Sequence, residues 1–195
     1  MANSIQNLPL AFVDLETTGL NPHKHEIIEI GVVIARQTGN PEQALEVVEE
    51  FEIQVKPAHI ELADPDALRV NQYHKRSWER AIPMADAAVI LEQKLKGCVF
   101  IAQNVVFDCS FLQSAFHKLG KSFDNVIYYQ KMDIASIAFG AKYDDPKLAR
   151  YTLRELSEYF QVKNVAAHTA LSDTRVAFEI TNKLLSKPPH QDRLF

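Results

Sequence analysis

The sequence predicts an α/β fold, a five-stranded mixed sheet flanked by helices. Short apolar runs of strand length alternate with longer segments whose apolar residues recur every three to four positions. The run at residues 46–56 alternates apolar and polar side chains, which is typical of an edge strand with one wet face. A chain of 195 residues is also long enough to bury a full core as one domain.

We expect strands at residues 9–16, 26–35, 46–56, 98–102 and 125–129. We expect helices at residues 64–71, 83–96, 105–119, 147–160 and 169–185. Four of these helices, all but the one at residues 64–71, are expected from an apolar stripe at helical spacing, for example Met84, Ala88, Leu91 and Leu95 before the terminating Gly97. The prolines Pro188 and Pro189 cannot continue a helix. We therefore expect one domain over residues 1–185 and a flexible tail over residues 186–195.

Two acids lie at the end of the first strand, in the segment Phe12-Val13-Asp14-Leu15-Glu16. Side chains at positions i and i+2 of a strand share a face, so Asp14 and Glu16 converge. Their neighbours are apolar, and two buried carboxylates repel each other and lose hydration. Divalent cations with a preference for oxygen ligands, Mg²⁺ or Mn²⁺, relieve both problems. A solvated strand face is the alternative explanation.

Two further acids lead helical stripes. Asp108 follows the polar turn after the 98–102 strand, and Asp173 begins the stripe of the last helix. Either acid alone would be an ordinary helix-start signal. His168 lies five residues before Asp173, which in a continuous helix would place it about 140° away. We therefore expect His168 on the loop before that helix.

Three ordered motifs contain these residues: Asp14-Leu15-Glu16-Thr17-Thr18-Gly19, Asn104-Val105-Val106-Phe107-Asp108, and His168 with Asp173. In this the chain resembles the DEDDh family of 3′–5′ exonucleases, which includes the epsilon proofreading subunit of bacterial DNA polymerase III and ribonuclease T. The resemblance extends from about Leu8 to Leu185 and implies a ribonuclease H-like fold.

The resemblance also implies roles for the motif residues. Asp14, Glu16, Asp108 and Asp173 would bind two Mg²⁺ or Mn²⁺ ions, and His168 would be the general base. Thr17 and Asn104 would contact the substrate. Asp133 matches a family position but is also explained as a helix cap. The chain has Gln103 where many relatives have a histidine, and Asn71 where the epsilon subunit has one. These departures leave the substrate preference open.

The expected activity is hydrolysis of single-stranded 3′ ends, of DNA in the first place, to nucleoside 5′-monophosphates. Trimming of RNA 3′ ends is one alternative, and a catalytically idle module that binds nucleic acid or a clamp is another. The chain has 21 basic and 25 acidic residues, or 21 of each without the four proposed ligands. The acidity thus belongs largely to the proposed metal site, and a modest affinity for phosphates is expected.

Two cysteines, Cys98 and Cys109, are too few for a disulfide framework, and no apolar run approaches the length of a membrane span. We therefore expect a cytoplasmic protein without a membrane partner. The segment Gln191-Asp192-Arg193-Leu194-Phe195 resembles the pentapeptide that binds the bacterial sliding clamp, with Gln191, Leu194 and Phe195 in place. Asp192 departs from the leucine that is usual at the second position. A tail without a partner is the alternative.

Overall fold

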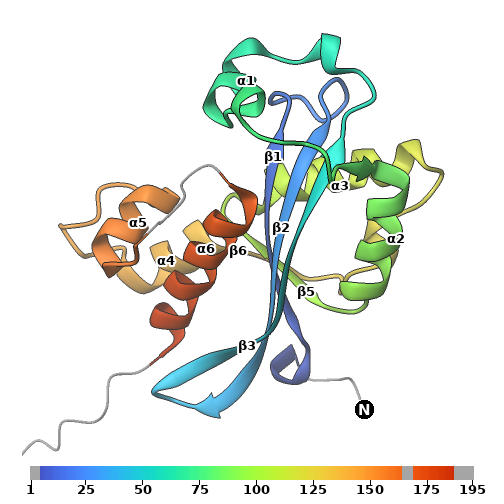
Figure 1. Ribbon diagram of the computed structural model, residues 1–195. Coiled ribbons are helices and arrows are strands. Elements are labelled where there is room, and N and C mark those ends of the chain that lie inside the picture. The colour runs from blue at the N-terminus through green and yellow to red at the C-terminus, as the bar shows by residue number, and fades with distance from the viewer. Residues whose placement is uncertain (1–4, 164–168, 187–195) are drawn as a thin grey trace, which may run out of the picture.

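The computed structural model describes residues 5–163 and 169–186, and within them six strands form one mixed sheet in the order β4-β3-β2-β1-β5-β6 (Figure 1). β1 pairs antiparallel with β2 and parallel with β5, and β2 pairs antiparallel with β3. The strands are β1 (Leu10–Thr17), β2 (Ile27–Asn40), β3 (Gln43–Lys56), β4 (Ile82–Pro83), β5 (Val99–Ala102) and β6 (Lys131–Asp133). The predicted α/β class is confirmed, with six strands instead of five because a two-residue strand, β4, joins the end of β3.

Six α-helices surround the sheet in the described residues: α1 (Pro65–Val70), α2 (Met84–Lys94), α3 (Val105–Lys118), α4 (Ile134–Lys142), α5 (Leu153–Phe160) and α6 (Ala170–Leu185). α6 lies on one face of the sheet with α4 and α5 beyond it, and α2 and α3 lie on the other face (Figure 1). α1 lies beyond the end of the sheet at which β1 terminates. None of these helices has the length and hydrophobicity that crossing a membrane would require.

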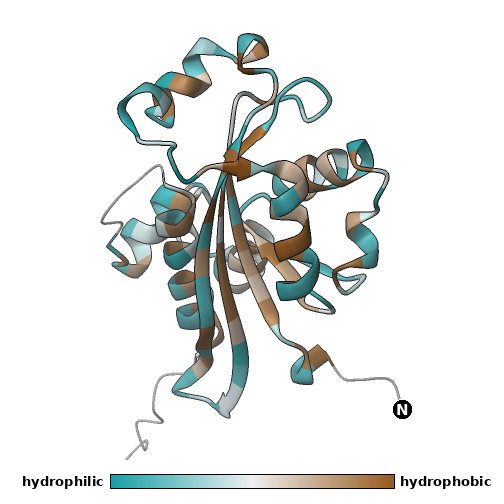
Figure 2. Ribbon diagram, turned by 45° about the vertical axis from the view of Figure 1, so that its right-hand side comes forward, coloured by the Kyte–Doolittle hydropathy of each residue, from teal (hydrophilic) through white to brown (hydrophobic). Residues whose placement is uncertain are grey.

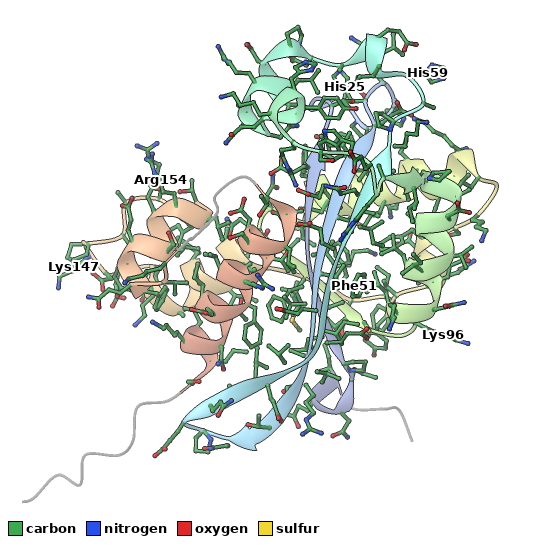
Figure 3. All side chains as sticks on the ribbon, in the orientation of Figure 1. His25, Phe51, His59, Lys96, Lys147 and Arg154 are labelled. Carbon is green, nitrogen blue, oxygen red and sulfur yellow. The ribbon has the colours of Figure 1, made fainter. Side chains whose placement is uncertain are left out.

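The sheet has a hydrophobic core on each face, because alternate residues of the central strand point to opposite sides. Ala11, Val13 and Leu15 pack with α2 and α3, whereas Leu10 and Phe12 pack with α4, α5 and α6. Side chains fill the space between sheet and helices on both faces (Figure 3). The hydropathy is highest in the central strands and falls toward the tip of the β2–β3 ribbon (Figure 2), where the last five residues of β2 are exposed.

Two predicted elements were wrong. The strand expected at 125–129 is a short 3-10 turn followed by irregular chain, and pairing with β5 comes later, at β6. The helix expected at 147–160 begins only at Leu153. The helix α4 was not predicted. Asp133 caps this helix by accepting a hydrogen bond from the amide of Ser136 at 2.8 Å. Helix capping was one of the two explanations that the sequence offered for Asp133.

Candidate active site

The carboxyl end of β1 directs two acids to one face of the sheet. Phe12 points into the core beneath α6, and Val13 points to the opposite core. By the same alternation Asp14 and Glu16 lie on the Phe12 face, as the sequence predicted. Both side chains are half-buried, whereas the neighbouring apolar residues of the strand are buried.

A glycine on β2 lets the beginning of α6 approach these acids. Gly31 is the register partner of Asp14, and a Cβ atom at this position would collide with the backbone of Ala170 and Leu171. Asp173 lies in the first turn of α6. One carboxylate oxygen each from Asp14, Glu16 and Asp173 lies within 4.8 Å of the others. Two segments nearly 160 residues apart in the chain thus meet at one point.

Asp108 joins the site from the other side of β1. It is 2% exposed and lies in the first turn of α3, outside the 4.8 Å group. The N-terminus of that helix is held by Asp133, whose carboxylate accepts a hydrogen bond from the Val105 amide at 2.9 Å. Asp133 therefore caps α4 and also fixes the helix that carries Asp108.

The electrostatics of the cluster favour a bound cation. Burial and then the neighbouring charges of Asp108 and Asp173 hold the pKa of Asp14 well above its usual range. Burial, followed by the charge of Asp173, raises the pKa of Glu16 to about 7. Burial also raises the pKa of Asp108, against the effect of hydrogen bonds from the backbone. Carboxylates that share one site resist ionisation together unless a positive charge compensates them.

The other residues that the sequence singled out differ in their exposure. The hydroxyl of Thr17 donates to the carbonyl oxygen of Gly19 at 2.8 Å and is buried, so it stabilises the turn after β1. Asn71 is buried and donates from its side-chain amide to the Thr17 carbonyl at 3.1 Å. Asn104 is exposed and begins α3 with a left-handed backbone, φ 61°. His168 and the segment with Gln191, Leu194 and Phe195 lie outside the described residues.

Sequence reasoning missed Glu29, which is fully buried in β2 as the register partner of Glu16. It is bound by Arg76 and by the amide of Ala170. A signal was present in the segment Ile27-Ile28-Glu29-Ile30, where one acid interrupts an apolar strand. A buried carboxylate requires a partner, but the partner could not be identified without the fold.

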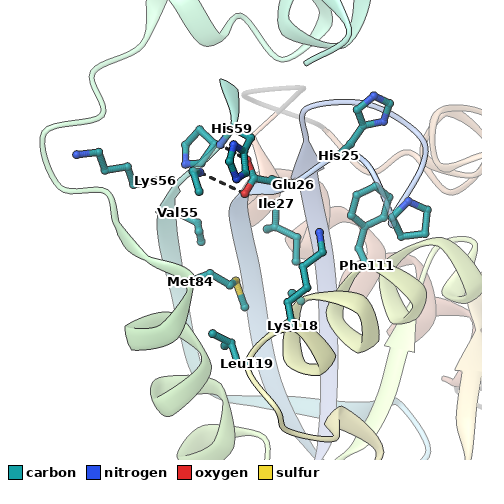
Figure 4. A pocket seen from close by; sticks show the side chains of 14 residues that line it. His25, Glu26, Ile27, Val55, Lys56, His59, Met84, Phe111, Lys118 and Leu119 are labelled. Carbon is teal, nitrogen blue, oxygen red and sulfur yellow. Dashed lines mark hydrogen bonds between the residues drawn. The ribbon is translucent and has the colours of Figure 1, made fainter. Parts of the chain in front are cut away.

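A cavity of about 380 Å³ lies on the opposite face of the sheet (Figure 4). Its walls are mainly apolar and include Ile27, Val55 and Phe111, which belong to the core between the sheet and α3. At its edge the carboxylate of Glu26 accepts hydrogen bonds from the amides of Ala58 and His59, at 3.2 and 2.7 Å. The cavity shares no lining residue with the acidic cluster.

Comparison with known proteins identifies relatives over most of the chain. It is 30% identical over 181 residues to the PolC-type DNA polymerase III of Caldanaerobacter subterraneus, a match that covers 89% of this chain and 11% of the polymerase. It is 27% identical to the 3′–5′ exonuclease DinG of Staphylococcus epidermidis, over 91% of this chain and 18% of DinG. The chain thus spans less than a fifth of the length of these two relatives.

The fold matches that of E. coli exonuclease I crystallised with a dT13 oligonucleotide, with a TM-score of 0.75 and 16% identity. That match covers 91% of this chain and 41% of exonuclease I. The sequence profile of the RNase_T family, described as exonuclease, matches residues 11–181. This range contains Asp14, Glu16, Asp108 and Asp173. The chain therefore belongs to the RNase_T exonuclease family.

Proposed function

We propose that this domain is a metal-dependent 3′–5′ exonuclease that removes nucleoside 5′-monophosphates from single-stranded DNA. The observation that carries the proposal is the convergence of Asp14, Glu16 and Asp173 within 4.8 Å at the end of β1. Membership of the exonuclease family gives this convergence its meaning. A structural role is a poor explanation, because three neighbouring carboxylates without a cation destabilise the fold.

The residues present fit two divalent cations. Asp14, Glu16, Asp108 and Asp173 offer only carboxylate oxygens, which Mg²⁺ and Mn²⁺ prefer. Burial is the largest cause of the raised pKa values of Asp14, Glu16 and Asp108, and neighbouring acids add to it. Bound cations would compensate the charge of these carboxylates. When bound, a pair of such ions activates water and stabilises the negative charge that develops on a phosphodiester.

The protein supplies the proton transfer and the alignment. We assign His168 as the base that accepts a proton from the attacking water, a role suited to an imidazole at neutral pH. The water oxygen bonds to the phosphorus of the terminal nucleotide, and the bond from that phosphorus to the 3′ oxygen of the preceding nucleotide breaks. The released 3′ oxygen takes a proton from solvent, which leaves a new 3′ hydroxyl and a free 5′-monophosphate. Thr17, through the turn that its hydroxyl stabilises, and Asn104, which is exposed at the start of α3, would align the terminal nucleotide.

The choice of DNA is supported by the relatives. One named relative is a DNA polymerase, and the exonuclease I structure contains a dT13 oligonucleotide. Single strands are favoured because a frayed end reaches four converging acids more easily than a paired one does. We further propose that Gln191, Leu194 and Phe195 bind a bacterial sliding clamp and bring the domain to DNA.

The decisive experiment uses 5′-labelled DNA and RNA oligomers with free or blocked 3′ ends. With Mg²⁺, the wild-type protein should shorten single-stranded DNA from a free 3′ hydroxyl, and EDTA should abolish this. Asp14→Asn should lower kcat by several orders of magnitude, because the metal pair is lost. Asp86→Asn is the matched control, since it makes the same change at an exposed position of α2.

Three results would contradict the proposal: activity in excess chelator, equal degradation of oligomers with blocked 3′ ends, or full activity of Asp14→Asn. Faster cleavage of RNA than of DNA would reassign the substrate while leaving the chemistry intact. Folding of Asp14→Asn is measured alongside, by thermal unfolding, so that a loss of activity is not mistaken for a loss of structure.

A further inference from the structure

Glu29 is a buried acid next to the proposed ligands that has no assigned role. Its side chain has no exposed surface, and it shares the face of Glu16, its register partner on β1. A carboxylate in such a place is tolerated only when hydrogen bonds and an opposite charge satisfy it. The partners of Glu29 therefore show what the fold uses it for.

Glu29 connects two distant parts of the chain. The Arg76 guanidinium binds it with two nitrogens: Nη1 donates to Oε2 at 2.9 Å and Nη2 donates to Oε1. The amide of Ala170 donates to Oε2 at 3.0 Å. Ala170 is the first residue of α6, and Asp173 follows three positions later in the same first turn. Glu29 thus binds the end of the helix that presents Asp173.

The first amides of a helix have no partner within the helix, and a side chain that accepts from them fixes where the helix begins. Here β2 supplies that acceptor from outside the helix. The close packing of α6 on Gly31 allows the contact, because Gly31 lies two residues from Glu29 on the same face. The start of α6 is therefore fixed against the strand next to β1.

Arg76 is itself held in place. Its guanidinium carbon lies 5.1 Å from the centre of the Trp78 ring, and Trp78 stacks on Tyr73 with ring centres 4.7 Å apart. The same segment begins at Asn71, which donates to the carbonyl of Thr17 at the end of β1. The guanidinium is thus restrained by a cation–π contact and by a segment anchored to the strand of the proposed ligands.

We propose that Glu29 and Arg76 are positioning residues: their ion pair fixes the first turn of α6 and thereby places Asp173 against Asp14 and Glu16. This inference rests on the proposed function for its consequence, the binding of catalytic metal ions. Loss of a residue that orients a metal ligand without contacting the metal typically lowers metal affinity or activity by about 10–100-fold. We expect an effect of this size when the ion pair is removed.

The test is metal binding by purified variants without substrate, from Mn²⁺ titrations followed by electron paramagnetic resonance. Arg76→Ala and Glu29→Gln should weaken Mn²⁺ binding by about 10–100-fold and lower kcat by a similar factor, with KM for the oligomer within about threefold. Arg76→Lys should restore part of both, because lysine keeps the charge but lacks the two-pronged geometry.

Arg36→Ala is the matched control. Arg36 on β2, like Arg76, binds a glutamate with two guanidinium nitrogens. Its Nε and Nη2 donate to Oε2 of Glu46 on β3 at 3.0 and 2.8 Å, but this pair is exposed. Its loss should leave Mn²⁺ affinity and kcat unchanged, as expected for an exposed ion pair.

The proposal is overturned if Arg76→Ala folds and retains Mn²⁺ affinity and kcat within threefold of the wild type. Should Arg76→Ala not fold, Glu29→Gln decides by the same criterion. Failure of the proposed function would look different: the wild-type protein would degrade no oligomer, and the Mn²⁺ titrations would still report whether the ion pair positions Asp173.

Discussion

At the scale of single residues, the acids of the site work against the stability of the metal-free fold. The pKa of Glu16 rises from 4.5 to about 7, with burial as the largest cause and the charge of Asp173 next. Between these two values the folded protein binds a proton that the unfolded chain releases. The contribution of Glu16 to stability is therefore full below pH 4.5 and is lost as the pH rises through 7.

We predict that Glu16→Gln stabilises the metal-free protein at pH 8 and has little effect at pH 4.5. At pH 8 the wild-type carboxylate is charged in a site that disfavours charge, and the amide removes that cost. A gain of about 1–2 kcal/mol corresponds to a rise in Tm of roughly 2–8 °C for a chain of this size. Thermal unfolding in EDTA at the two pH values measures it.

Glu50→Gln provides a control of opposite sign, because the hydrogen bond from Arg175 lowers the pKa of Glu50. That variant should be equal to or less stable than the wild type at pH 8. Addition of Mn²⁺ should reverse the order of Glu16→Gln and wild type, since the substitution removes one of the four carboxylates proposed to bind the cation. A Glu16→Gln variant whose Tm at pH 8 in EDTA is no higher than that of wild type would show that the folded protein does not disfavour the charge of Glu16.

At the scale of elements, the sequence predicted what depends on local pattern. The strand with Asp14 and Glu16 and the helices with Asp108 and Asp173 lie within one or two residues of their expected bounds. The 125–129 segment shows why the pattern can mislead. Val126 and Ile127 are buried in the core like strand residues. The backbone of this segment also makes two hydrogen bonds just before β5, to Gly97 and Cys98. Regular pairing with β5 nevertheless begins only at Lys131.

The start of α5 was predictable from a local signal that the apolar stripe concealed. Thr152 and Glu155 form a capping pair, in which the Glu155 amide donates to the Thr152 hydroxyl at 3.3 Å. The apolar stripe extends back to Ala149 and suggested a longer helix. Gly31, Glu29 and Arg76 were not predictable in their roles, because those roles depend on the strand register and on the fold that brings Arg76 and α6 to β2.

The contact of α6 with Gly31 gives a prediction about packing. Gly31→Ala should displace the start of α6, because the added methyl group meets the backbone of Ala170 and Leu171. We expect a loss of about 1–3 kcal/mol in the free energy of unfolding. We also expect kcat to fall at temperatures where the variant is fully folded, since Asp173 moves with the helix.

Gly140→Ala is the matched control for this variant. Gly140 lies within α4, and apart from its chain neighbours and the backbone of its own helix, no atom of the described residues lies within 4 Å of the position that its Cβ would take. Alanine is the better helix former, so this variant should be slightly more stable and fully active. Urea unfolding and single-turnover kinetics compare the two. Equal stability and kcat for Gly31→Ala and Gly140→Ala would show that α6 has room to move.

At the scale of the whole molecule, the charge distribution leaves little surface for a strong grip on DNA. The formal net charge is −4, and many cations are paired with acids, including Arg150 with Glu155 and Lys131 with Asp124. Lys147 and Arg154 extend outward on the side of α5, and Lys96 extends outward on the opposite side of the molecule (Figure 3). A protein with few phosphate contacts shows a shallow dependence of affinity on salt and gains from a tether.

The segment from Gln191 to Phe195 is the proposed tether. One substitution in it is expected to raise its affinity for the sliding clamp. Asp192→Leu supplies the leucine usual at the second position of the clamp-binding pentapeptide, so it should tighten binding to a purified bacterial sliding clamp. Leu194→Ala combined with Phe195→Ala should weaken that binding by at least about 30-fold, because buried apolar anchors dominate such contacts.

Both changes should leave kcat and KM on free oligomers at wild-type values, because the segment lies beyond the predicted domain. On primed DNA loaded with the clamp, the order of activity should instead follow clamp affinity, with Asp192→Leu fastest. Calorimetry gives the affinities, and the kinetics give their consequence. If neither substitution changes the measured clamp affinity, the segment is no tether, and the weak grip expected from the surface charge limits the enzyme on its own.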